Sequence, residues 1–399
     1  MTNDVMKVPE LRFSEFDGDW EELRIGQLAE IVRGSSPRPI SDPKWFDSKS
    51  EIGWLRISDV TKQNGRITNL EQRISVDGQN KTRVLYSEHL LLSIAATVGK
   101  PVINYVKTGV HDGFLIFLNP LFDIEYMFQW LDAFRPKWKK YGQPGSQVNL
   151  NSELVRSQKI VIPDTVEQKR IGEFFSKLDR QIELEEQKLE KLEEQKKGYM
   201  QKVFSQELRF KDENGNDYDE WKEEKLENIA DFQNGKAHEN LVSIEGEYVL
   251  VNSKFISTDT RIKKHVSQQL TPLNKEDIAI VMSDIPNGKA LAKCFLVDEN
   301  NKYSLNQRIG RIYNILGDSR FLYLILNRNK QLLKYDSGVG QTNLKKSEIT
   351  DILLNWPIKE EQQKIGDFFR KIDELIEKQS EKIEVLNMRK KGFLQKMFV

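Results

Sequence analysis

The feature that most constrains this chain is a stretch of about 40 residues that occurs twice. Residues 163–204 have the sequence PDTVEQKRIGEFFSKLDRQIELEEQKLEKLEEQKKGYMQKVF, and residues 357–398 have the sequence PIKEEQQKIGDFFRKIDELIEKQSEKIEVLNMRKKGFLQKMF. The copies align without a gap at an offset of 194 residues, and roughly half of the aligned positions are identical. Because this period is far too long for a solenoid, each repeat must contain a globular domain as well as the long segment.

Both copies are predicted to be long helices that pair. Their apolar residues recur at heptad spacing, which is typical of a helix packed against another helix. At ~1.5 Å per residue, each helix is roughly 60 Å long. The predicted seam consists of Phe175, Leu178, Ile182, Leu189 and Leu192 in the first copy, and of Phe369, Ile372, Ile376, Ile383 and Leu386 in the second.

Polar residues interrupt this seam at equivalent places in the two copies. Glu185 corresponds to Gln379, and Lys196 corresponds to Lys390. One interpretation is that an exposed seam tolerates them. The other is that they fix the register and the choice of partner at some cost in stability.

The globular segments also start alike. The sequence ELRF at 10–13 is followed by Trp20, and the same ELRF at 207–210 is followed by Trp221. If a pseudo-two-fold axis relates the halves, the two helices run antiparallel and Phe398 lies near residues 10–13. Glu185 and Gln379 then meet where the helix midpoints cross.

We therefore predict an α+β fold with two globular α/β-mixed domains in tandem, each followed by a long helix. The two helices form an antiparallel coiled coil with pseudo-two-fold symmetry. Short apolar runs, among them 53–60, 90–96 and 277–284, are predicted to be strands, whereas 123–134 and 319–334 have helical periodicity. The expected domains are residues 1–162, 163–205, 206–356 and 357–399.

Composition excludes several classes of protein. With 61 basic and 61 acidic residues, the chain lacks the global basic excess of many nucleic-acid-binding proteins. The single cysteine, Cys294, excludes an intramolecular disulfide framework and favours a reducing compartment. No apolar run approaches the ~18–20 residues that cross a bilayer, and no signal peptide is apparent. We expect a soluble, cytoplasmic protein that does not insert into a membrane.

Motifs for catalysis are missing. His89, His111, His238 and His265 have no metal-ligand spacing to one another or to Cys294, so we expect no metal site. No phosphate-binding loop and no G-x-S-x-G nucleophile motif occurs. The sequence therefore predicts a binding protein without catalytic residues and without a cofactor of its own.

Several predicted loops contain the side chains that proteins use on DNA. Arg, Lys, Asn and Gln pair with base edges, while Lys and backbone amides hold phosphates. Trp45 and Trp138, which lie among them, are expected to pack in the core. The candidate DNA-binding residues are Arg33, Ser35, Ser36, Arg38, Lys44, Gln143, Ser146, Gln147 and Asn149 in the first half, and Gln233, Asn234, Lys236, Lys254, Arg261, Lys263, Lys264, Asn306, Gln307, Arg308, Gln341, Asn343, Lys345 and Lys346 in the second.

Taken together, the order and duplication of these phrases resemble the specificity (S) subunits of type I restriction-modification enzymes. The phrases are VPELRF, SPRP followed by WLRISD (54–59), the openings EQKRIGEFFSKLD and EQQKIGDFFRKID, and SLNQRI (304–309). The second half departs from the first, because NGKAHEN (234–240) replaces SPRP.

The resemblance implies that each globular domain is a target recognition domain for one half of a split site in double-stranded DNA. The helices would set the gap and dock two modification subunits, and two restriction subunits would complete the complex. S-adenosylmethionine, ATP and Mg would then be bound by those partners, and no homo-oligomer is required. The alternative is a non-catalytic coiled-coil scaffold whose heads bind proteins.

Overall fold

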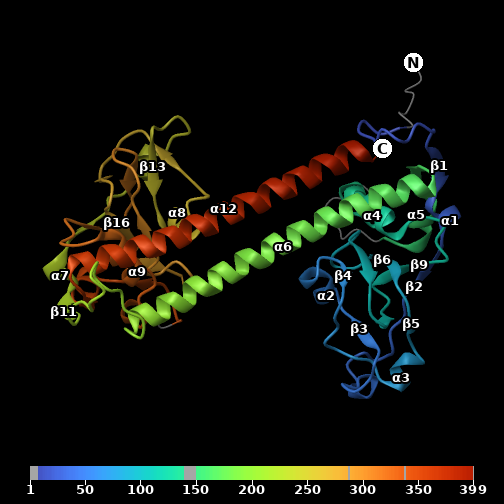
Figure 1. Cartoon of the computed structure of the whole chain (residues 1–399), viewed down its shortest axis with the longest axis horizontal. Coiled ribbons are helices and arrows are strands. Elements are labelled where there is room, and N and C mark those ends of the chain that lie inside the picture. Colours follow the sequence, from blue (N-terminus) through green and yellow to red (C-terminus); the bar gives the residue numbers. More distant parts are fainter. Residues whose placement is uncertain (1–7, 139–149, 286–287, 337, 399) are drawn as a thin grey trace. The chain divides into compact units, whose positions relative to one another are not determined.

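The computed structural model describes residues 8–138, 150–285, 288–336 and 338–398. They form two compact units (Figure 1). Unit 1 contains the residues up to 188 and those from 379 onward, and unit 2 contains residues 189–378. The long helices α6 (Thr165–Phe204) and α12 (Lys359–Met397) each contribute one part to each unit. We call the globular part of unit 1 head 1 and that of unit 2 head 2.

Head 1 is built from β-sheets, with short helices and α4 on their faces. The five-stranded sheet has the order β2-β9-β6-β7-β4, and a second sheet has the order β3-β8-β5. The strands are β1 (Glu21–Arg24), β2 (Glu30–Arg33), β3 (Gly53–Leu55), β4 (Arg66–Ile67), β5 (Arg83–Leu85), β6 (His89–Ser93), β7 (Pro101–Asn104), β8 (Thr108–Val110), β9 (Phe114–Leu118) and β10 (Lys159–Ile162). The helices are α1 (Ile25–Leu28), η1 (Pro43–Trp45), α2 (Ile57–Lys62), α3 (Val76–Gln79), α4 (Ile124–Trp138) and α5 (Ser152–Ser157).

Head 2 repeats this plan. Its sheets have the orders β12-β20-β16-β18 and β14-β13-β19-β15, and β11 pairs with β22 as β1 pairs with β10. The strands are β11 (Lys222–Lys225), β12 (Asp231–Asn234), β13 (Tyr248–Val251), β14 (His265–Val266), β15 (Pro272–Leu273), β16 (Ile278–Val281), β17 (Ser283–Asp284), β18 (Cys294–Leu296), β19 (Tyr303–Leu305), β20 (Ile309–Tyr313), β21 (Thr342–Asn343) and β22 (Leu353–Trp356). The helices are α7 (Leu226–Ile229), η3 (Glu239–Leu241), α8 (Ser253–Ser257), α9 (Ser319–Leu326), α10 (Lys330–Leu333) and α11 (Lys346–Thr350).

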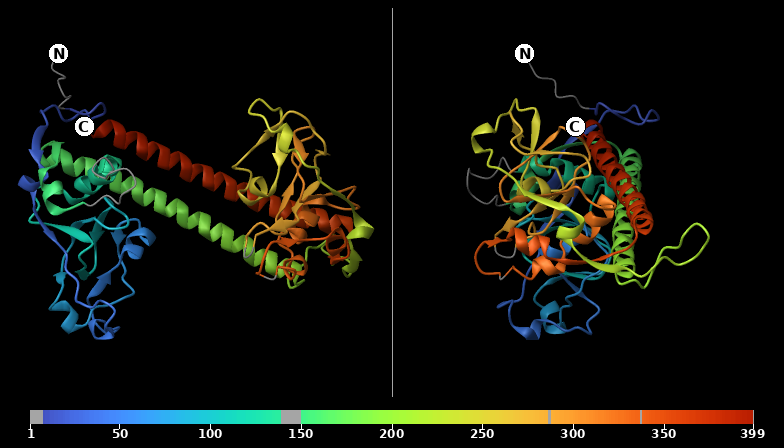
Figure 2. Two further views of the ribbon diagram at one scale, coloured as in Figure 1. Left: turned by 180° about the vertical axis from the view of Figure 1, so that it is seen from behind. Right: turned by 90° about the vertical axis from the view of Figure 1, so that its left-hand side faces the viewer.

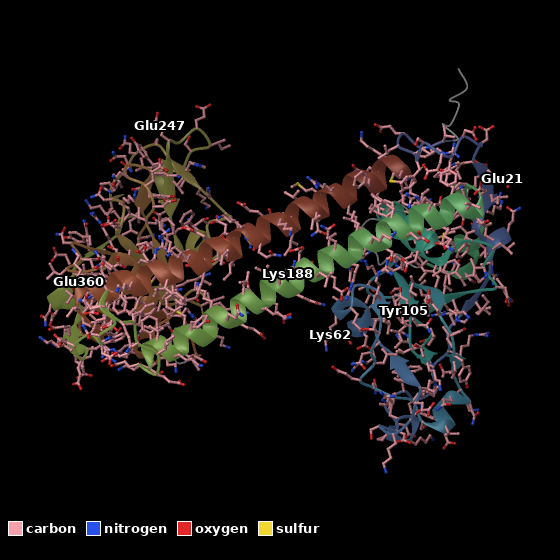
Figure 3. All side chains as sticks on the ribbon, viewed as in Figure 1. Glu21, Lys62, Tyr105, Lys188, Glu247 and Glu360 are labelled. Atoms are coloured by element: carbon pink, nitrogen blue, oxygen red, sulfur yellow. The ribbon has the colours of Figure 1, made fainter. Side chains whose placement is uncertain are left out.

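Each central sheet has a core on both of its faces, because successive side chains of a strand point to opposite sides. In β6, Leu90 and Leu92 belong to the core that α4 and α6 cover, whereas Leu91 faces the core under the second sheet. In β16, Ile278 and Ile280 face one core and Ala279 and Val281 the other. This explains why these strands are continuous apolar runs rather than alternating ones. Figure 3 locates Tyr105, directly after β7, and Glu247, directly before β13.

Within each unit the two long helices pack against each other antiparallel (Figures 1 and 2). In unit 1, the ring of Phe174 lies 5.1 Å from that of Phe393, and Phe175 stacks on Phe398 at 5.7 Å. In unit 2, Phe204 stacks on Phe369 at 6.3 Å. Early residues of one helix thus meet late residues of the other, as predicted, and all ten predicted seam residues are buried or half-buried.

The polar interruptions of the seam have specific partners. Gln379 donates from Nε2 to Oε2 of Glu185 at 2.8 Å, so the equivalent residues of the two copies contact each other, as predicted. Lys390 pairs with Asp179 at 2.7 Å in unit 1, and Lys196 pairs with Asp373, the equivalent of Asp179, at 2.6 Å in unit 2. Since Glu185 is only 5% exposed, the structure supports a register role over mere tolerance at an exposed seam.

The two ELRF segments anchor each head to a helix N-terminus. Arg12 donates two hydrogen bonds to the buried carboxylate of Glu167, and Arg209 does the same to Glu361. The amide of Leu11 also donates to the carbonyl of Lys396 at 2.8 Å. The last turn of α12 therefore lies beside residues 10–13, as predicted.

Two predicted elements differ from the structure. The strand predicted over 53–60 ends at Leu55, because Asp59 accepts a hydrogen bond from the amide of Arg56 and starts α2. The helix predicted over 319–334 is two helices, because the side chain of Asn329 caps a new helix by accepting from the amide of Gln331. In the described ranges, no helix is long and apolar enough to cross a lipid bilayer.

Candidate nucleic-acid interface

Three of the predicted DNA-binding residues of head 1 converge on Asp112, in the turn between β8 and β9. Ser36 donates to Oδ1 of Asp112 at 2.9 Å, and Arg38 donates to its Oδ2 at 2.7 Å. Arg33 donates to the carbonyl of Asp112 at 2.6 Å. Asp112 thus holds the end of β2 through its main-chain carbonyl and the following loop through its carboxylate.

Asp112 was missed by sequence reasoning. Burial raises the pKa of its carboxyl, but hydrogen bonding from Ser36 and the charge of Arg38 outweigh burial and keep the pKa below its usual value. The guanidinium of Arg38 is 79% exposed in this pair and thus remains accessible to a ligand. A Ser and an Asp that are 76 residues apart carry no local pattern, so only the fold reveals this contact.

A cavity of about 660 Å³ opens beside this cluster. Its walls include Pro37, Ile40, Trp54 and the ring of His111, with Arg38 among the charged groups that line it. Burial lowers the pKa of His111, which favours the neutral imidazole at pH 7. Aromatic and apolar walls with a few polar groups are suited to the face and edge of a nucleobase.

The remaining candidates of head 1 lie apart or outside the described residues. Ser35 is fixed by its amide, which donates to the carbonyl of Val110 at 3.0 Å. Lys44 lies on η1 over the ring of Trp45 at 4.5 Å. Trp45 and Trp138 are buried, as predicted. Gln143, Ser146, Gln147 and Asn149 lie outside the described residues.

In head 2, the structure brings one group of candidates to the place that corresponds to the Asp112 cluster. Gln233 and Asn234 end β12, and the neighbouring Lys236 forms a bridge to Asn306 before β20. Gln307 donates to Glu239. Arg308, in the tight turn between β19 and β20, has a positive φ of 67°. Most of these side chains are exposed.

The other candidates of head 2 form two further groups. The first, on and after α8, consists of the exposed residues Lys254, Arg261, Lys263 and Lys264. The second lies at β21 and α11, where Gln341 donates to Ser283 at 2.6 Å and Asn343, Lys345 and Lys346 are exposed. The residues that the sequence predicts thus do not form one contiguous cluster in this head.

Neither cluster has the composition of a metal site. Among the residues that the structure describes, no three His, Cys, Asp or Glu side chains are grouped so that they could hold a metal ion. His238 is buried, and its Nε2 lies 2.8 Å from the hydroxyl of Ser304. The contacts of His238 thus stabilise the loop of residues 234–240.

Comparison with known proteins gives the family. The sequence model of one protein family, the type I restriction modification DNA specificity domain, matches residues 17–194 and again residues 218–387. Because these matches span most of the chain, the chain belongs to this family and contains its domain twice.

Curated relatives and solved structures agree with this assignment. The chain is 24% identical over 413 residues to the type I restriction enzyme MjaVIII specificity subunit of Methanocaldococcus jannaschii, with 96% of this chain and 94% of the relative covered. It is 23% identical to the putative MjaX specificity subunit of the same organism, with 94% and 92% covered.

The fold is shared with solved structures. The crystal structure of the type I restriction-modification S subunit from M. genitalium matches with a TM-score of 0.62 at 15% identity and covers 98% of this chain and 99% of that chain. A chain from a structural study of complex assembly in the type I R-M system matches with a TM-score of 0.55 at 14% identity, with 95% and 97% covered.

Proposed function

We propose that this chain is the sequence-specificity subunit of a type I restriction-modification system and that it binds double-stranded DNA without catalysing a reaction. Each head, in residues 1–162 and 206–356, reads one half of a bipartite site. The helical segments 163–205 and 357–399 set the gap between the halves and dock two modification subunits. Two restriction subunits complete the complex, and S-adenosylmethionine, ATP and Mg are bound by the partners.

The observation that carries this proposal is that the two units repeat the same framework of contacts but present different side chains on their heads. The anchoring contacts of Arg12 and Arg209 and the seam contacts of the helices repeat between the units. At the corresponding edge of the heads, however, head 1 presents Ser36, Arg38 and Asp112, whereas head 2 presents Gln307 and Arg308. Equal frames with unequal side chains are what two unlike half-sites require.

The test is to express the chain with its modification subunit and to map methylated adenines by single-molecule sequencing. Arg38→Ala and Asp112→Asn should relax or change the half-site that head 1 reads and leave the other half-site intact. Gln307→Ala is the matched variant and should affect the opposite half-site alone. A good bidentate contact is worth about 1–3 kcal/mol of discrimination, which corresponds to roughly 5- to 150-fold.

The length of the gap between the two half-sites gives a second readout. Deleting one heptad from each helix shortens it by about 10 Å and should change the permitted gap without changing either half-site. If methylation ignores the identity of the heads, the chain is a protein-binding scaffold instead.

A further inference from the structure

The two heads differ at one edge of their central sheets. In head 1 the edge strand is β4, which pairs in parallel with β7 at Arg66↔Ile103. The amides of Ile103 and Tyr105 donate to the carbonyls of Gly65 and Ile67 at 2.8 and 2.9 Å. In head 2 the corresponding sheet ends at β18, and no described strand pairs with its outer edge.

The register of the strands identifies the equivalent positions. Ile103 pairs with Leu90 of β6, and Leu296 pairs with Ile278 of β16. Leu90 and Ile278 in turn pair with equivalent residues of β9 and β20. Leu296 and Asp298 therefore occupy the positions whose amides bind β4 in head 1. The N–H of Cys294 on the same edge already donates to Asn327 at 3.0 Å.

A cavity lies where β4 would be. It has a volume of about 740 Å³, and Leu296 and Asp298 line it together with residues of α9 and of the first half of α12. All of the lining residues belong to unit 2.

The segment that forms β4 in head 1 has a counterpart in head 2 that does not reach this edge. Arg261 and Ile262 follow α8 as Arg66 and Ile67 follow α2. Ile67 is fully buried, but Ile262 is 42% exposed. Arg73, where the chain next pairs with β3, lies seven positions after Arg66, whereas His265, where the chain pairs with β13, lies four positions after Arg261. At ~3.3 Å per residue, this connection is about 10 Å shorter.

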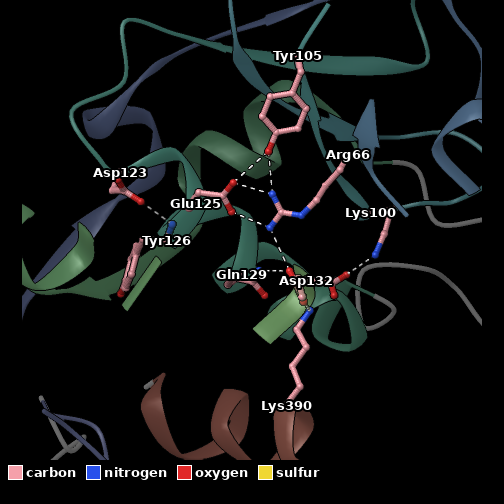
Figure 4. Close-up of polar contacts among 10 residues, drawn as sticks. Arg66, Lys100, Tyr105, Asp123, Glu125, Tyr126, Gln129, Asp132 and Lys390 are labelled. Atoms are coloured by element: carbon pink, nitrogen blue, oxygen red, sulfur yellow. Dashed lines mark hydrogen bonds and ion pairs between the residues drawn. The ribbon is translucent and has the colours of Figure 1, made fainter. Parts of the chain in front are cut away.

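The charge at one position that faces this edge is also inverted. In head 1, Arg66 donates to both carboxylate oxygens of Glu125 at 2.6 and 2.7 Å and to Asp179 at 3.0 Å, beside Lys390 (Figure 4). Burial opposes the charge of Arg66, but the hydrogen bonds that Arg66 donates to Glu125 and the charge of Glu125 outweigh burial and raise the pKa of Arg66. These contacts attach β4 to α4 and α6.

The position of Glu125, two residues after the cap of α4, is taken in head 2 by Arg320, two residues after the cap of α9. Arg320 lies 3.8 Å from Asp373, whose closer partner is Lys196 at 2.6 Å. Lys275 and Lys359, which also line the cavity, form no ion pair with any residue that the structure describes. The lining of the cavity carries both signs of charge, with Asp259, Glu276, Asp298, Asp318, Asp367 and Asp373 beside Lys275, Arg320, Lys359 and Arg370. At the position of Glu125, however, the charge is reversed, so a strand side chain that faces Arg320 as Arg66 faces Glu125 would be stabilised if it were acidic.

We propose that the outer edge of β18 binds an extended segment of a partner protein, which adds as a strand and places an acidic side chain against Arg320. Main-chain carbonyls of the segment accept from the amides of Leu296 and Asp298, as Gly65 and Ile67 do in head 1. A polypeptide is required because donors at strand spacing match only another strand. The segment belongs to the modification subunit, so this inference rests on the proposed function, which names that subunit as a partner.

The experiment is hydrogen exchange of the full-length chain, alone and with the modification subunit. We expect the amides of Leu296 and Asp298 to exchange at least tenfold more slowly in the complex. Ile103 and Tyr105 are the internal control, because β4 already protects them, and their rates should not change.

Variants separate this contact from general stabilisation. Leu296→Pro removes an outward-facing donor and spares the ladder with β16, in which Val297 donates to Asp277. It and Arg320→Glu should weaken binding of the modification subunit tenfold or more, and Arg320→Lys should restore most of it. Lys330→Glu makes the same charge change outside the cavity and should leave binding unchanged.

The outcomes distinguish this inference from the proposed function. A complex that forms and methylates a bipartite site without protecting β18 overturns the inference alone. If no complex forms and no methylation is seen, the proposed function fails and the partner named here fails with it.

Discussion

Glu185 is the residue at which polar contacts of both long helices converge. Its carboxylate accepts from Gln379 at 2.8 Å, and Lys382 and Lys188 lie 3.0 and 3.1 Å from its Oε1. The hydrogen bond from Gln379, followed by those from the two lysines, lowers the pKa of Glu185 to about 2. A carboxyl with a depressed pKa stabilises the fold above its unfolded pKa and loses this contribution as the pH falls through the folded pKa.

Replacing Glu185 with Gln should therefore lower the melting temperature at pH 7, because the two lysines lose their anionic partner. The difference from the unmodified chain should persist down to about pH 4.5, the usual range of a free Glu, and should shrink as the pH approaches 2. Thermal unfolding followed by circular dichroism over this range provides the measurement. A difference that does not depend on pH would mean that the charge of Glu185 contributes nothing.

The pair of Arg12 and Glu167 predicts a larger effect. Glu167 is fully buried, and Arg12 donates to both of its carboxylate oxygens while the indole of Trp20 donates a third hydrogen bond. Arg12→Ala leaves this carboxylate buried with its main partner gone, which typically costs roughly 3–5 kcal/mol. Lys159→Ala removes an exposed ion pair with Glu22 and should change the free energy of unfolding by less than about 1 kcal/mol. Urea denaturation of both variants would test this, and equal losses would contradict it.

At the scale of single residues, the sequence predicts which residue types form the candidate site better than it predicts where each of them lies in the fold. Arg33, Ser36 and Arg38 were found because their loop contains Gly, Pro and basic residues, and they do form one cluster. Asp112, which holds them, is separated from Ser36 by 76 residues and had no signal of its own. The open edge of β18 could not be predicted either, because it depends on strand order and on a connection three residues too short.

Among the helices and strands, the close contact between α6 and the N-terminus of α4 depends on a glycine. A Cβ on Gly172 would lie 2.6 Å from Oδ1 of Asp123 and 2.9 Å from the amide nitrogen of Tyr126. Asp123 cannot retreat easily, because it caps α4 by accepting from Tyr126 at 2.8 Å. In unit 2, a Cβ on Gly366 would likewise lie 2.6 Å from Oδ1 of Asp318.

Gly172→Ala should therefore destabilise the chain by about 1–3 kcal/mol, although alanine favours a helix. Gly198, in the same helix, has no atom within 4 Å of its Cβ position, so Gly198→Ala should stabilise by up to about 1 kcal/mol. Opposite signs in thermal or urea unfolding are the expected result. Stabilisation by both substitutions would show that α4 and α6 do not approach as closely as the structure has them.

Elements with strong periodicity were predicted well, and those set by a single cap were not. The long helices and the strands β6 and β16 overlap the predicted ranges, because their apolar runs must be buried, although the range 277–284 also includes the separate strand β17. The sequence predicts strand over the start of α2 because its apolar residues continue those of β3, whereas the hydrogen bond from the amide of Arg56 to Asp59 starts a helix there. Local propensity cannot predict the boundary between β3 and α2, because a single side-chain hydrogen bond determines it.

For the chain as a whole, the repeat implies that its sequence order is almost cyclic. The end of α12 meets residues 10–13 through the bond from Leu11 to Lys396, and the end of α6 meets residues 207–210 through the bond from Leu208 to Lys202 at 3.0 Å. The end of α6 and residues 207–210 are also linked directly by the chain, whereas the end of α12 and residues 10–13 are not. The connection after α6 is also exposed around Asn214, in a turn with Gly215 at φ 84°.

A circular permutant opened at Asn214, with the original ends joined by a short linker, should therefore fold and direct methylation to the same bipartite site. Every contact of Arg12, Glu167, Arg209 and Glu361 is retained in it, since only the exposed turn is cut. A permutant opened between Lys188 and Leu189 is the matched control and should fail, because it interrupts α6 within its pairing with α12. Methylation sequencing and solubility provide the readouts. If the Asn214 permutant is insoluble while the α6 permutant remains active, the order of contacts described for the two units is wrong.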